Sequence, residues 1–318
     1  MYKKRVYLIT GAGGFIGACL ARRLIENNEN VHILLKKATN TWRIQDIIHK
    51  VTVHMSDLSD LQRLREIIAD IKPDIIYHLA TCGAYSYQNA PDSIINTNIL
   101  GTWNLLKATS QINYELFVNT GSSSEYGFKK NPMKETDLLE PASYYAVTKS
   151  SQTLLCSYIA RLEKKPMVTL RPFSVYGPYE EQTRFVPVLL KSIYCNEKIN
   201  LVSPKIARDY IYVDDIVDAY LSIDRLKKFP GEIFNIGTGV QSTIKDMVDV
   251  AMRVTGKTAD CNWCGMQHRN WDTDNWVADI SKAKRLLNWK PKTDLQIGMD
   301  LFWEWLKPNH HFYIQSKR

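Results

Sequence analysis

Long apolar stretches and paired cysteines are what this sequence lacks. No apolar segment is long enough to span a bilayer. The first residues, MYKKRVYLIT, contain no apolar core followed by a signal-peptide cleavage site. The six cysteines are scattered, without the spacing of a disulfide framework. We therefore expect a cytoplasmic protein with no membrane partner.

A metal site is not expected either. Cys261 and Cys264 form a single C-x-x-C pair, and His268 lies close behind them in the sequence. Together they offer three ligands, whereas a structural zinc ion is held by four.

Runs of like charge and low-complexity tracts are also missing. The 41 Lys and Arg residues exceed the 33 Asp and Glu residues, giving a net charge of +8, but the two signs are interspersed. Excess positive charge favours anionic partners, and its dispersal argues against nucleic acid and for small phosphorylated molecules. With 318 residues, 45% of them hydrophobic, the chain is long enough for a large α/β domain and a smaller one.

A glycine-rich loop near the N-terminus is the most informative feature present. The short apolar run Val6–Ile9 predicts a buried strand, and the apolar segment from Phe15 to Ile25 predicts a helix. Gly11 and Gly14 lie between this strand and this helix, and Gly17 lies within the helix. Their spacing is G-x-x-G-x-x-G rather than G-x-G-x-x-G. A strand that breaks at glycines and restarts as a helix presents bare backbone N–H groups, which suit a pyrophosphate.

Strand and helix patterns then alternate along the chain. Strands are predicted at 31–35, 51–55, 74–80 and 116–120, with helices at 61–71, 98–109 and 145–161 between and after them. Such alternation predicts an α/β protein with a doubly wound, parallel Rossmann sheet.

Two lysines end the second predicted strand. In dinucleotide-binding folds that bind NAD, an acidic residue usually follows the glycines by about 20 positions and binds the ribose hydroxyl. Lys36 and Lys37 occupy that place here. We interpret them as favouring the 2′-phosphate of NADP, with NAD as the alternative cofactor. A solvated basic pair at a strand end would look the same.

A tyrosine and a lysine share one face of the helix predicted over 145–161. Tyr145 and Lys149 are four residues apart, so their side chains are neighbours. An ammonium group beside a phenol favours the phenolate, which predicts a lowered pKa for Tyr145 and a role as general acid/base. An ordinary surface pair has the same spacing.

Further motifs accompany this pair in a set order. They are TGAGGFIG, the dipeptide at Asp57–Leu58, HLA, the serine turn after 120, YAVTK, LRPFSVYGP, RDYIYVDD, FNIGTG, and RNWD followed by ADISKAKRLLNWKPK. In this order they resemble the extended short-chain dehydrogenase/reductase family, specifically its nucleotide-sugar branch of epimerases, dehydratases and reductases. The resemblance covers nearly the whole chain.

The resemblance implies roles for residues at matching positions. The catalytic residues would be Ser122, Tyr145 and Lys149. Cofactor contacts, with the lysine pair included, would come from Gly11, Gly14, Phe15, Ile16, Gly17, Lys36, Lys37, Asp57, Leu58, Leu79, Ala80, Thr81, Asn98, Lys149 and Pro172. Substrate contacts would come from Ser123, Ser124, Ser174, Arg208 and Arg269. Within this last set the two arginines would bind the diphosphate, for which guanidinium geometry is suited; structural salt bridges are the alternative.

Departures from the family pattern narrow the expected reaction. Family dehydratases have an acidic residue where Ser124 stands, and Glu125, one residue later, is expected to point away. Ser174 replaces the asparagine common in sugar epimerases. The stretches LLKKATNTWRI and NTGSSSEYG most resemble 4-ketoreductases of the CDP-abequose and CDP-paratose synthase type. We therefore expect NADPH-dependent reduction of a 4-keto nucleotide deoxysugar. A 4-epimerase or 4-dehydrogenase with NAD is the alternative, followed by a catalytically silent dinucleotide-binding regulator.

The expected division places residues 1–172 and 209–237 in the dinucleotide-binding domain. Residues 173–208 and 238–318 would form a smaller, mixed α/β domain that binds the nucleotide sugar, with the active site between the two. By the same resemblance, the helices over 98–109 and 145–161 would form the interface of a homodimer.

Overall fold

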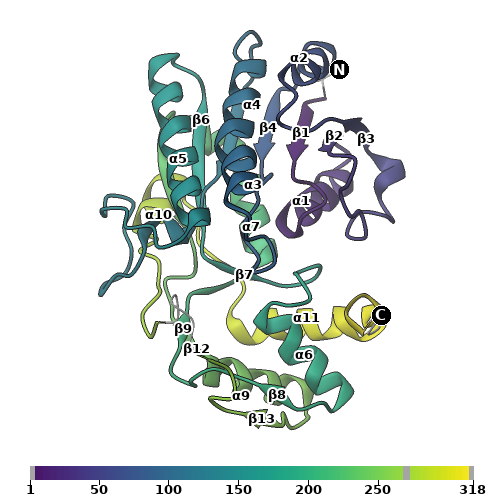
Figure 1. Ribbon diagram of the computed structural model, residues 1–318, viewed down its shortest axis with the longest axis vertical. Coiled ribbons are helices and arrows are strands. Elements are labelled where there is room, and N and C mark those ends of the chain that lie inside the picture. Colours follow the sequence, from purple (N-terminus) through teal and green to yellow (C-terminus); the bar gives the residue numbers. More distant parts are fainter. Residues whose placement is uncertain (1–3, 268–272, 315–318) are drawn as a thin grey trace.

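The carboxyl ends of one parallel sheet organise the molecule. The computed structural model describes residues 4–267 and 273–314. Within them the main sheet has seven strands, all parallel, in the order β3-β2-β1-β4-β5-β6-β11 (Figure 1). The strands are β1 (Val6–Thr10), β2 (Asn30–Leu35), β3 (Thr52–Met55), β4 (Ile75–His78), β5 (Leu116–Thr120), β6 (Met167–Pro172) and β11 (Ile233–Ile236). The predicted Rossmann fold is therefore confirmed.

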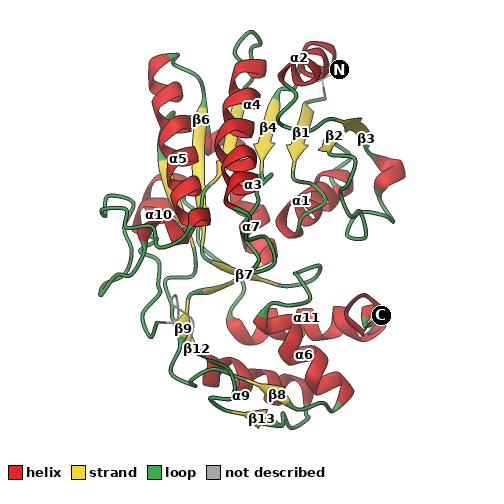
Figure 2. Ribbon diagram, viewed as in Figure 1, coloured by secondary structure: helices red, strands yellow, loops and turns green. Residues whose placement is uncertain are grey.

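Alternating side chains of each strand supply two cores, one on each face of the sheet. In β1, Tyr7 and Ile9 enter one core and Leu8 enters the other, as the two-residue period of a strand requires. The first core is closed by α1 (Phe15–Glu26), α7 (Val213–Tyr220), α8 (Ile223–Leu226) and α10 (Ser281–Leu287). The second is closed by α2 (Leu61–Ile71), α4 (Gly101–Thr109) and α5 (Tyr144–Leu162). Figure 2 shows the strands between these helices.

The helix predicted over 98–109 begins earlier than expected. It starts as α3 (Pro91–Ile95), passes through the wider π turn η2 (Asn96–Leu100) and continues as α4. Proline is favoured in the first turn of a helix because its missing N–H would be unpaired there anyway. The π turn lies beside α5, the helix that carries Tyr145.

A smaller lobe lies below the sheet in Figure 1 and has its own core. Its helices are α6 (Phe185–Cys195), α9 (Ile244–Thr255), α11 (Leu295–Asn309) and α12 (His311–Ile314). Short strand pairs complete it: β7 (Ser174–Tyr176) with β10 (Tyr210–Tyr212), β9 (Ala207–Arg208) with β12 (Ser242–Thr243), and β8 (Ile199–Asn200) with β13 (Cys261–Asn262). The short helical turns η1 (Ile48–Lys50) and η3 (Ser123–Tyr126) belong to the larger part.

The chain passes between the two parts more than once. Ala283 and Leu287 of α10 pack in the first core, although the expected division places this segment in the smaller domain. The domain boundaries remain a prediction, and this packing would assign α10 to the larger domain.

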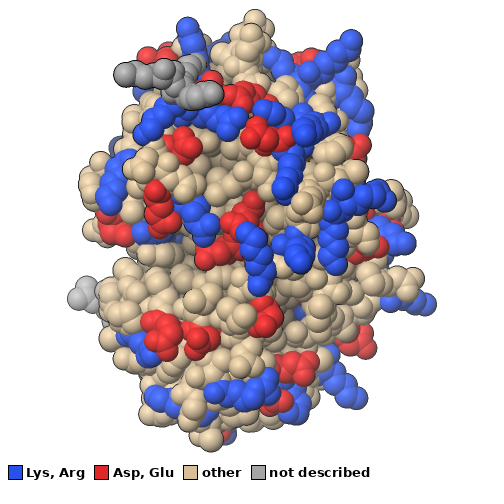
Figure 3. All heavy atoms as spheres, turned by 180° about the vertical axis from the view of Figure 1, so that it is seen from behind, with Lys and Arg blue, Asp and Glu red and all other residues tan. Residues whose placement is uncertain are grey.

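Charged side chains of both signs lie on the molecular surface. On the face drawn in Figure 3, basic and acidic side chains are interspersed. No helix in the described part of the chain is both long and apolar enough to cross a membrane.

Candidate active site at the carboxyl ends of the strands

Most of the predicted site residues follow the carboxyl end of a strand in the main sheet. Gly11 follows β1, Lys36 follows β2, Asp57 lies just beyond β3, Leu79 follows β4 and Ser122 lies just beyond β5. In a parallel sheet these ends meet at one edge, which is where ligands bind in such folds.

The glycine loop leaves no room for side chains. Gly11 has a φ of +77°, and a Cβ there would lie 2.5 Å from the backbone nitrogen of Ala80. A Cβ on Gly17 would lie 2.3 Å from the Gly11 carbonyl oxygen. Helix α1 starts at Gly14 with no side chain capping its first N–H groups. This uncapped helix end and bare loop fit the pyrophosphate of a dinucleotide. Phe15 and Ile16 continue the first turn, with Phe15 buried.

The substitution Gly11→Ala should therefore prevent dinucleotide binding. An alanine at position 11 would have to adopt a left-handed backbone conformation, and its methyl group would clash with the backbone just after β4. We therefore expect the affinity for the dinucleotide to fall at least about tenfold. Isothermal titration calorimetry measures this. Gly256→Ala is the matched control, because Gly256 has a φ of +65° with nothing within 4 Å of its would-be Cβ. Equal effects of the two variants on dinucleotide affinity would contradict this role for Gly11.

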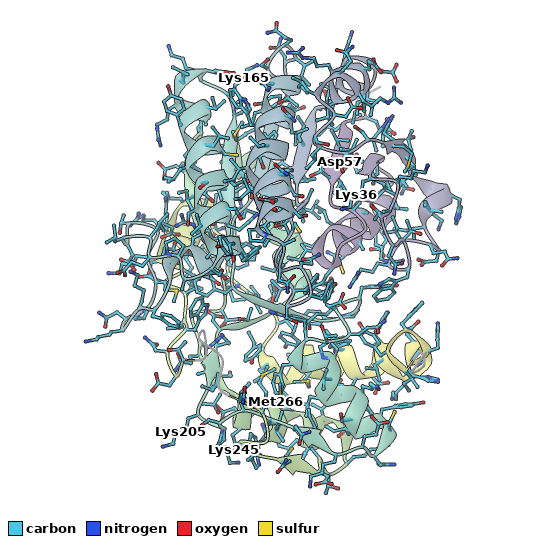
Figure 4. The ribbon with its side chains drawn as sticks, viewed as in Figure 1. Lys36, Asp57, Lys165, Lys205, Lys245 and Met266 are labelled. Atoms are coloured by element: carbon cyan, nitrogen blue, oxygen red, sulfur yellow. The ribbon has the colours of Figure 1, made fainter. Side chains whose placement is uncertain are left out.

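The lysine pair lies beside a carboxylate. Lys36 and Lys37 are exposed, and Figure 4 shows Lys36 next to Asp57. The pKa of Asp57 is lowered, first by the hydrogen bond from the Ser59 backbone N–H and also by the charge of Lys36. The positive charge of Lys36 is thus partly balanced within the protein.

A buried hydrogen-bond chain links β1, β4 and α4. The Thr10 hydroxyl hydrogen-bonds His78 Nδ1 at 2.7 Å, and His78 Nε2 bonds Thr102 Oγ1 at 2.8 Å. Because the Thr102 hydroxyl donates to the Asn98 carbonyl, its oxygen accepts from His78 Nε2–H. Burial lowers the pKa of His78 to about 3, so the ring is neutral. The chain ends at the backbone N–H of Ala80, which donates to Thr10 Oγ1 at 3.3 Å.

Asn98 positions the neighbouring loop. Its amide oxygen accepts from the Cys82 backbone N–H at 2.8 Å and from the Thr81 hydroxyl at 3.2 Å. Its amide nitrogen donates to the Cys82 carbonyl and to Thr148 Oγ1, both at 2.9 Å. This side chain is fully buried, so it connects the loop after β4 to the helix that carries Lys149.

The structure brings Ser122, Tyr145 and Lys149 to one place. Ser122 caps η3 by accepting the Ser124 backbone N–H at 3.1 Å, and its side chain lies near enough to Tyr145 to act on the pKa of that phenol. Lys149 is almost fully buried; its ammonium donates to the Thr120 carbonyl and to Gln152 Oε1, the latter at 2.6 Å. Burial lowers the pKa of Lys149 to about 8.

The expected lowering of the Tyr145 pKa by Lys149 is wrong for this structure. Burial raises the pKa of Tyr145, and the hydrogen bond from Ser122 opposes that rise. The lysine ammonium donates to acceptors from β5 and α5, and its charge is not among the causes of the shift in the Tyr145 pKa. The shared helix face brought the two residues close, but the side-chain contacts decided the electrostatics.

Glu125 is withdrawn from the site in a buried ion pair. Its Oε2 accepts from Arg171 Nε at 2.9 Å and lies 2.7 Å from Arg171 Nη2, with both side chains at most 1% exposed. Its Oε1 accepts from the Ser122 backbone N–H at 2.7 Å and the Thr153 hydroxyl at 3.0 Å. Arg171 also donates to Tyr126 Oη at 2.8 Å. Glu125 therefore holds the Ser122 turn in place and is not available as a catalytic acid.

On the substrate side, one contact was not foreseen from the sequence. The indole N–H of Trp276 donates to Ser123 Oγ at 3.1 Å. The guanidinium of Arg208 lies 5.2 Å from the centre of the Trp276 ring and donates to the Ala207 and Thr273 carbonyls. No motif marked Trp276, although it follows the RNWD motif closely. Arg269 lies outside the described residues.

The other predicted residues lie around these groups. Leu58 is buried and packs against Gly101. Ser124 is half-buried, and Pro172 is the last residue of β6. The backbone N–H of Ser174 in β7 donates to the Asp209 carbonyl at 3.0 Å.

No metal centre accompanies the site in the part of the chain that the structure describes. There, no three His, Cys, Asp or Glu side chains are grouped so that they would hold a metal ion. Cys261 and Cys264 are free thiols, and His268 is not among the described residues.

Comparison with known proteins decides the family. The model of the family described as GDP-mannose 4,6 dehydratase matches residues 8–301. The chain belongs to this extended short-chain dehydrogenase/reductase family. It is an NAD(P)-dependent, nucleotide-sugar-modifying enzyme of that family, as the sequence motifs predicted.

Its relatives include several 4-epimerases. The chain is 29% identical to a UDP-glucuronate 4-epimerase of Thermodesulfobacterium geofontis, with 95% of this chain and 96% of that protein covered. The structure of a UDP-glucose 4-epimerase of Thermotoga maritima with UDP-glucose superposes with a TM-score of 0.88 at 26% identity, covering 96% and 99% of the two chains. A UDP-glucuronic acid 4-epimerase of Bacillus cereus, in complex with UDP-glucuronic acid and NAD, gives a TM-score of 0.85 at 29% identity, covering 95% and 99%. These relatives favour the second of the expected reactions, epimerisation, over 4-keto reduction.

Proposed function

We propose that this enzyme is an NAD-dependent 4-epimerase of a UDP-linked hexose or hexuronate. The observation that carries the proposal is the Ser122–Tyr145 pair, which lies at the same edge of the sheet as the glycine loop, with the carboxylate of the serine turn, Glu125, bound to Arg171. Such a site offers proton exchange at a sugar oxygen but no acid for eliminating water. The 4-epimerases among the relatives support the same reaction.

Side chains of the enzyme would transfer the proton from and to the sugar oxygen O4. Tyr145 would have to be ionised to take the proton from the 4-hydroxyl group; it would later return that proton to O4, while the Ser122 hydroxyl donates to the same oxygen. Lys149 would contact the nicotinamide ribose of bound NAD, as the family resemblance implies. When bound, NAD supplies hydride acceptance from C4 and return to it. Because the proton and the reducing equivalent both come back to the sugar, no external reductant is needed.

We propose NAD rather than the NADP expected from Lys36 and Lys37. The carboxylate of Asp57 lies near enough to Lys36 for the lysine charge to lower its pKa. This nearby negative charge weakens the attraction of Lys36 for a 2′-phosphate. The Bacillus cereus relative was solved with NAD. The Gly11 loop and the start of α1 would hold the pyrophosphate of either dinucleotide.

The decisive experiment is a turnover assay without added cofactor. The purified enzyme is incubated with UDP-glucose, UDP-galactose, UDP-glucuronate and UDP-galacturonate, and the products are separated by chromatography. We expect interconversion of one C4 pair with no net change in reduced nicotinamide. Loss of one water from the substrate would indicate a dehydratase. In a second assay with added NADPH and a nucleotide-linked 4-keto-6-deoxysugar, consumption of NADPH without epimerisation would support the reductase.

We also propose that the enzyme is a homodimer through α4 and α5. These helices expose large apolar side chains at Trp103, Val147, Leu154, Tyr158 and Leu162. Exposed apolar side chains gathered on neighbouring helices mark an interaction surface.

The substitution Leu154→Glu should separate the dimer into monomers. A charge placed at the centre of an apolar interface has no partner after burial. Size-exclusion chromatography with light scattering measures the mass. Leu138→Glu is the matched control, because Leu138 is 75% exposed and lies on a loop outside both helices. A wild-type protein that runs as a monomer would contradict the proposal.

A further inference from the structure

The loop after β2 lies against the glycine loop. Residues 36–47 connect β2 to η1 and begin with the lysine pair. A Cβ on Gly13 would lie 2.6 Å from the methyl carbon of Thr39 and 3.4 Å from the Asn40 carbonyl oxygen. In dinucleotide-binding folds the adenosine ribose binds just after the second strand. This loop is therefore placed to form one wall of the dinucleotide site.

A buried arginine binds this loop to the segment between β7 and α6. Arg43 is 6% exposed; its Nε donates to the Tyr179 carbonyl at 2.7 Å, and its Nη2 donates to Glu181 Oε2 at 2.9 Å. Arg22 of α1 donates to the Arg43 carbonyl at 2.7 Å and forms an ion pair with Asp46, further along the loop. The loop is thus connected both to the helix that follows the glycines and to the chain leading into the smaller lobe.

The indole of Trp42, in the same loop, lies against the C-terminal helix α12. Its ring centre is 5.2 Å from that of Phe312 and 6.3 Å from that of Tyr313, which it meets edge-on. The Tyr313 hydroxyl donates to the Glu180 carbonyl at 3.1 Å, and the Gln182 side chain donates to the Phe312 carbonyl at 2.6 Å. Aromatic pairs at such distances attract each other beyond the apolar area that they bury. The loop after β2 and α12 therefore pack together.

Tyr179 lies at the centre of these contacts. Its φ of +68° is one that residues with a side chain rarely adopt. Its ring centre lies 4.7 Å from that of Trp305 and 6.2 Å from that of Trp42, and the Cζ of Arg22 lies 4.2 Å above it. Such a backbone conformation persists where the surrounding contacts hold it. Groups from α1, from the loop and from α11, which lies below α1 in Figure 1, supply these contacts.

We propose that Trp42 is a positioning residue for the dinucleotide. By packing against Phe312 and Tyr313 it holds the loop 36–47 against the glycine loop, so that the adenosine half of a bound dinucleotide leaves slowly. We call these three aromatic residues the latch.

The latch rests on the proposed function, in which NAD is oxidised again on the enzyme at every turnover. Such an enzyme gains from holding its dinucleotide, because it never has to exchange it. A reductase has to release the oxidised dinucleotide after each turnover, and a latch would slow that step.

Four variants test the latch. Trp42→Ala removes the indole, Phe312→Ala removes its partner, the double variant removes both, and Trp42→Phe keeps an aromatic ring. Trp263→Ala is the matched control, because Trp263 is also a half-buried tryptophan but follows β13 in the smaller lobe. The rate of NAD dissociation measures retention, and titration calorimetry with UDP measures the other half of the site. Hydrogen exchange of residues 36–47 reports the loop itself and needs no cofactor.

Trp42→Ala should raise the rate of NAD dissociation about tenfold and speed hydrogen exchange of the loop, while UDP affinity stays unchanged. Phe312→Ala should change both quantities in the same direction. The double variant should release NAD no faster than Trp42→Ala alone, because both substitutions remove the same contact. Trp42→Phe should release NAD within about threefold of the wild-type rate, since a ring remains to pack against α12.

Other outcomes overturn the proposal. NAD dissociation as slow in Trp42→Ala as in Trp263→Ala would show that the indole does not hold the dinucleotide. Multiplying effects of Trp42→Ala and Phe312→Ala would show that Trp42 does not act through α12. If Trp42→Ala fails to fold, Phe312→Ala decides the proposal by the same measurements. A wild-type enzyme that retains NAD without epimerising a UDP-sugar contradicts the proposed function alone. One that epimerises, while both variants release NAD at the wild-type rate, contradicts the latch alone.

Discussion

Tyr145→Phe is expected to lower kcat at least about 100-fold while leaving NAD content unchanged. Phenylalanine keeps the helix face and the packing of the ring, and removes only the phenolic hydroxyl, on whose pKa Ser122 acts. General acid/base groups contribute about 100-fold or more to the rate. Turnover of the UDP-sugar and absorbance of the released dinucleotide measure the two quantities.

The neighbouring residue supplies the control for this variant. Tyr144→Phe removes the same atom from the same helix, but Tyr144 is 61% exposed and directed to solvent. It should retain wild-type activity. A Tyr145→Phe enzyme with more than about a tenth of wild-type turnover would mean that Tyr145 is not the acid/base group.

The second large effect is expected at the buried ion pair. Arg171→Met should lower the free energy of unfolding by about 3–5 kcal/mol, because it leaves the Glu125 carboxylate buried without a cation. Total stability of a protein is typically about 5–15 kcal/mol, so this is a large fraction. Denaturant unfolding followed by circular dichroism measures it. Activity should fall as well, because Glu125 holds the backbone N–H of Ser122.

Two further variants make this result specific to the buried charge. Glu125→Gln combined with Arg171→Met should be less destabilising than Arg171→Met alone, since no unpaired charge remains. Arg63→Met breaks an ion pair with Glu66 whose side chains are 48% and 50% exposed, and should cost less than about 1 kcal/mol. An Arg171→Met variant as stable as Arg63→Met would refute the importance of the pair.

Local patterns in the sequence predicted the fold and the centre of the site. The apolar run before Gly11 and the amphipathic segment after it can only be a strand and a helix, and their alternation along the chain implies a parallel sheet. Spacing alone places Tyr145 and Lys149 on one helix face. These features depend on residues only a few positions apart in the sequence, so the sequence alone predicts them.

The sequence motifs do not predict which reaction the enzyme catalyses. Reduction and epimerisation at C4 use the same serine, tyrosine and lysine, so these motifs do not distinguish them. The sequence favoured a 4-ketoreductase from Lys36, Lys37 and short local likenesses, whereas the relatives favour epimerisation. Asp57, whose carboxylate lies near Lys36, comes from the loop just after the next strand of the sheet.

By itself, then, the sequence determined a Rossmann sheet, a dinucleotide loop, and a tyrosine and lysine on one helix face, because each depends on residues a few positions apart. Tertiary structure alone decided which partners these groups have. Arg171 binds Glu125 across 46 positions, and Trp276 binds Ser123 across 153. It also turned Lys149 toward Thr120 and raised the pKa of Tyr145. Hydrogen bonds and burial depend on which side chains meet in space, and the spacing of residues along the chain does not specify that.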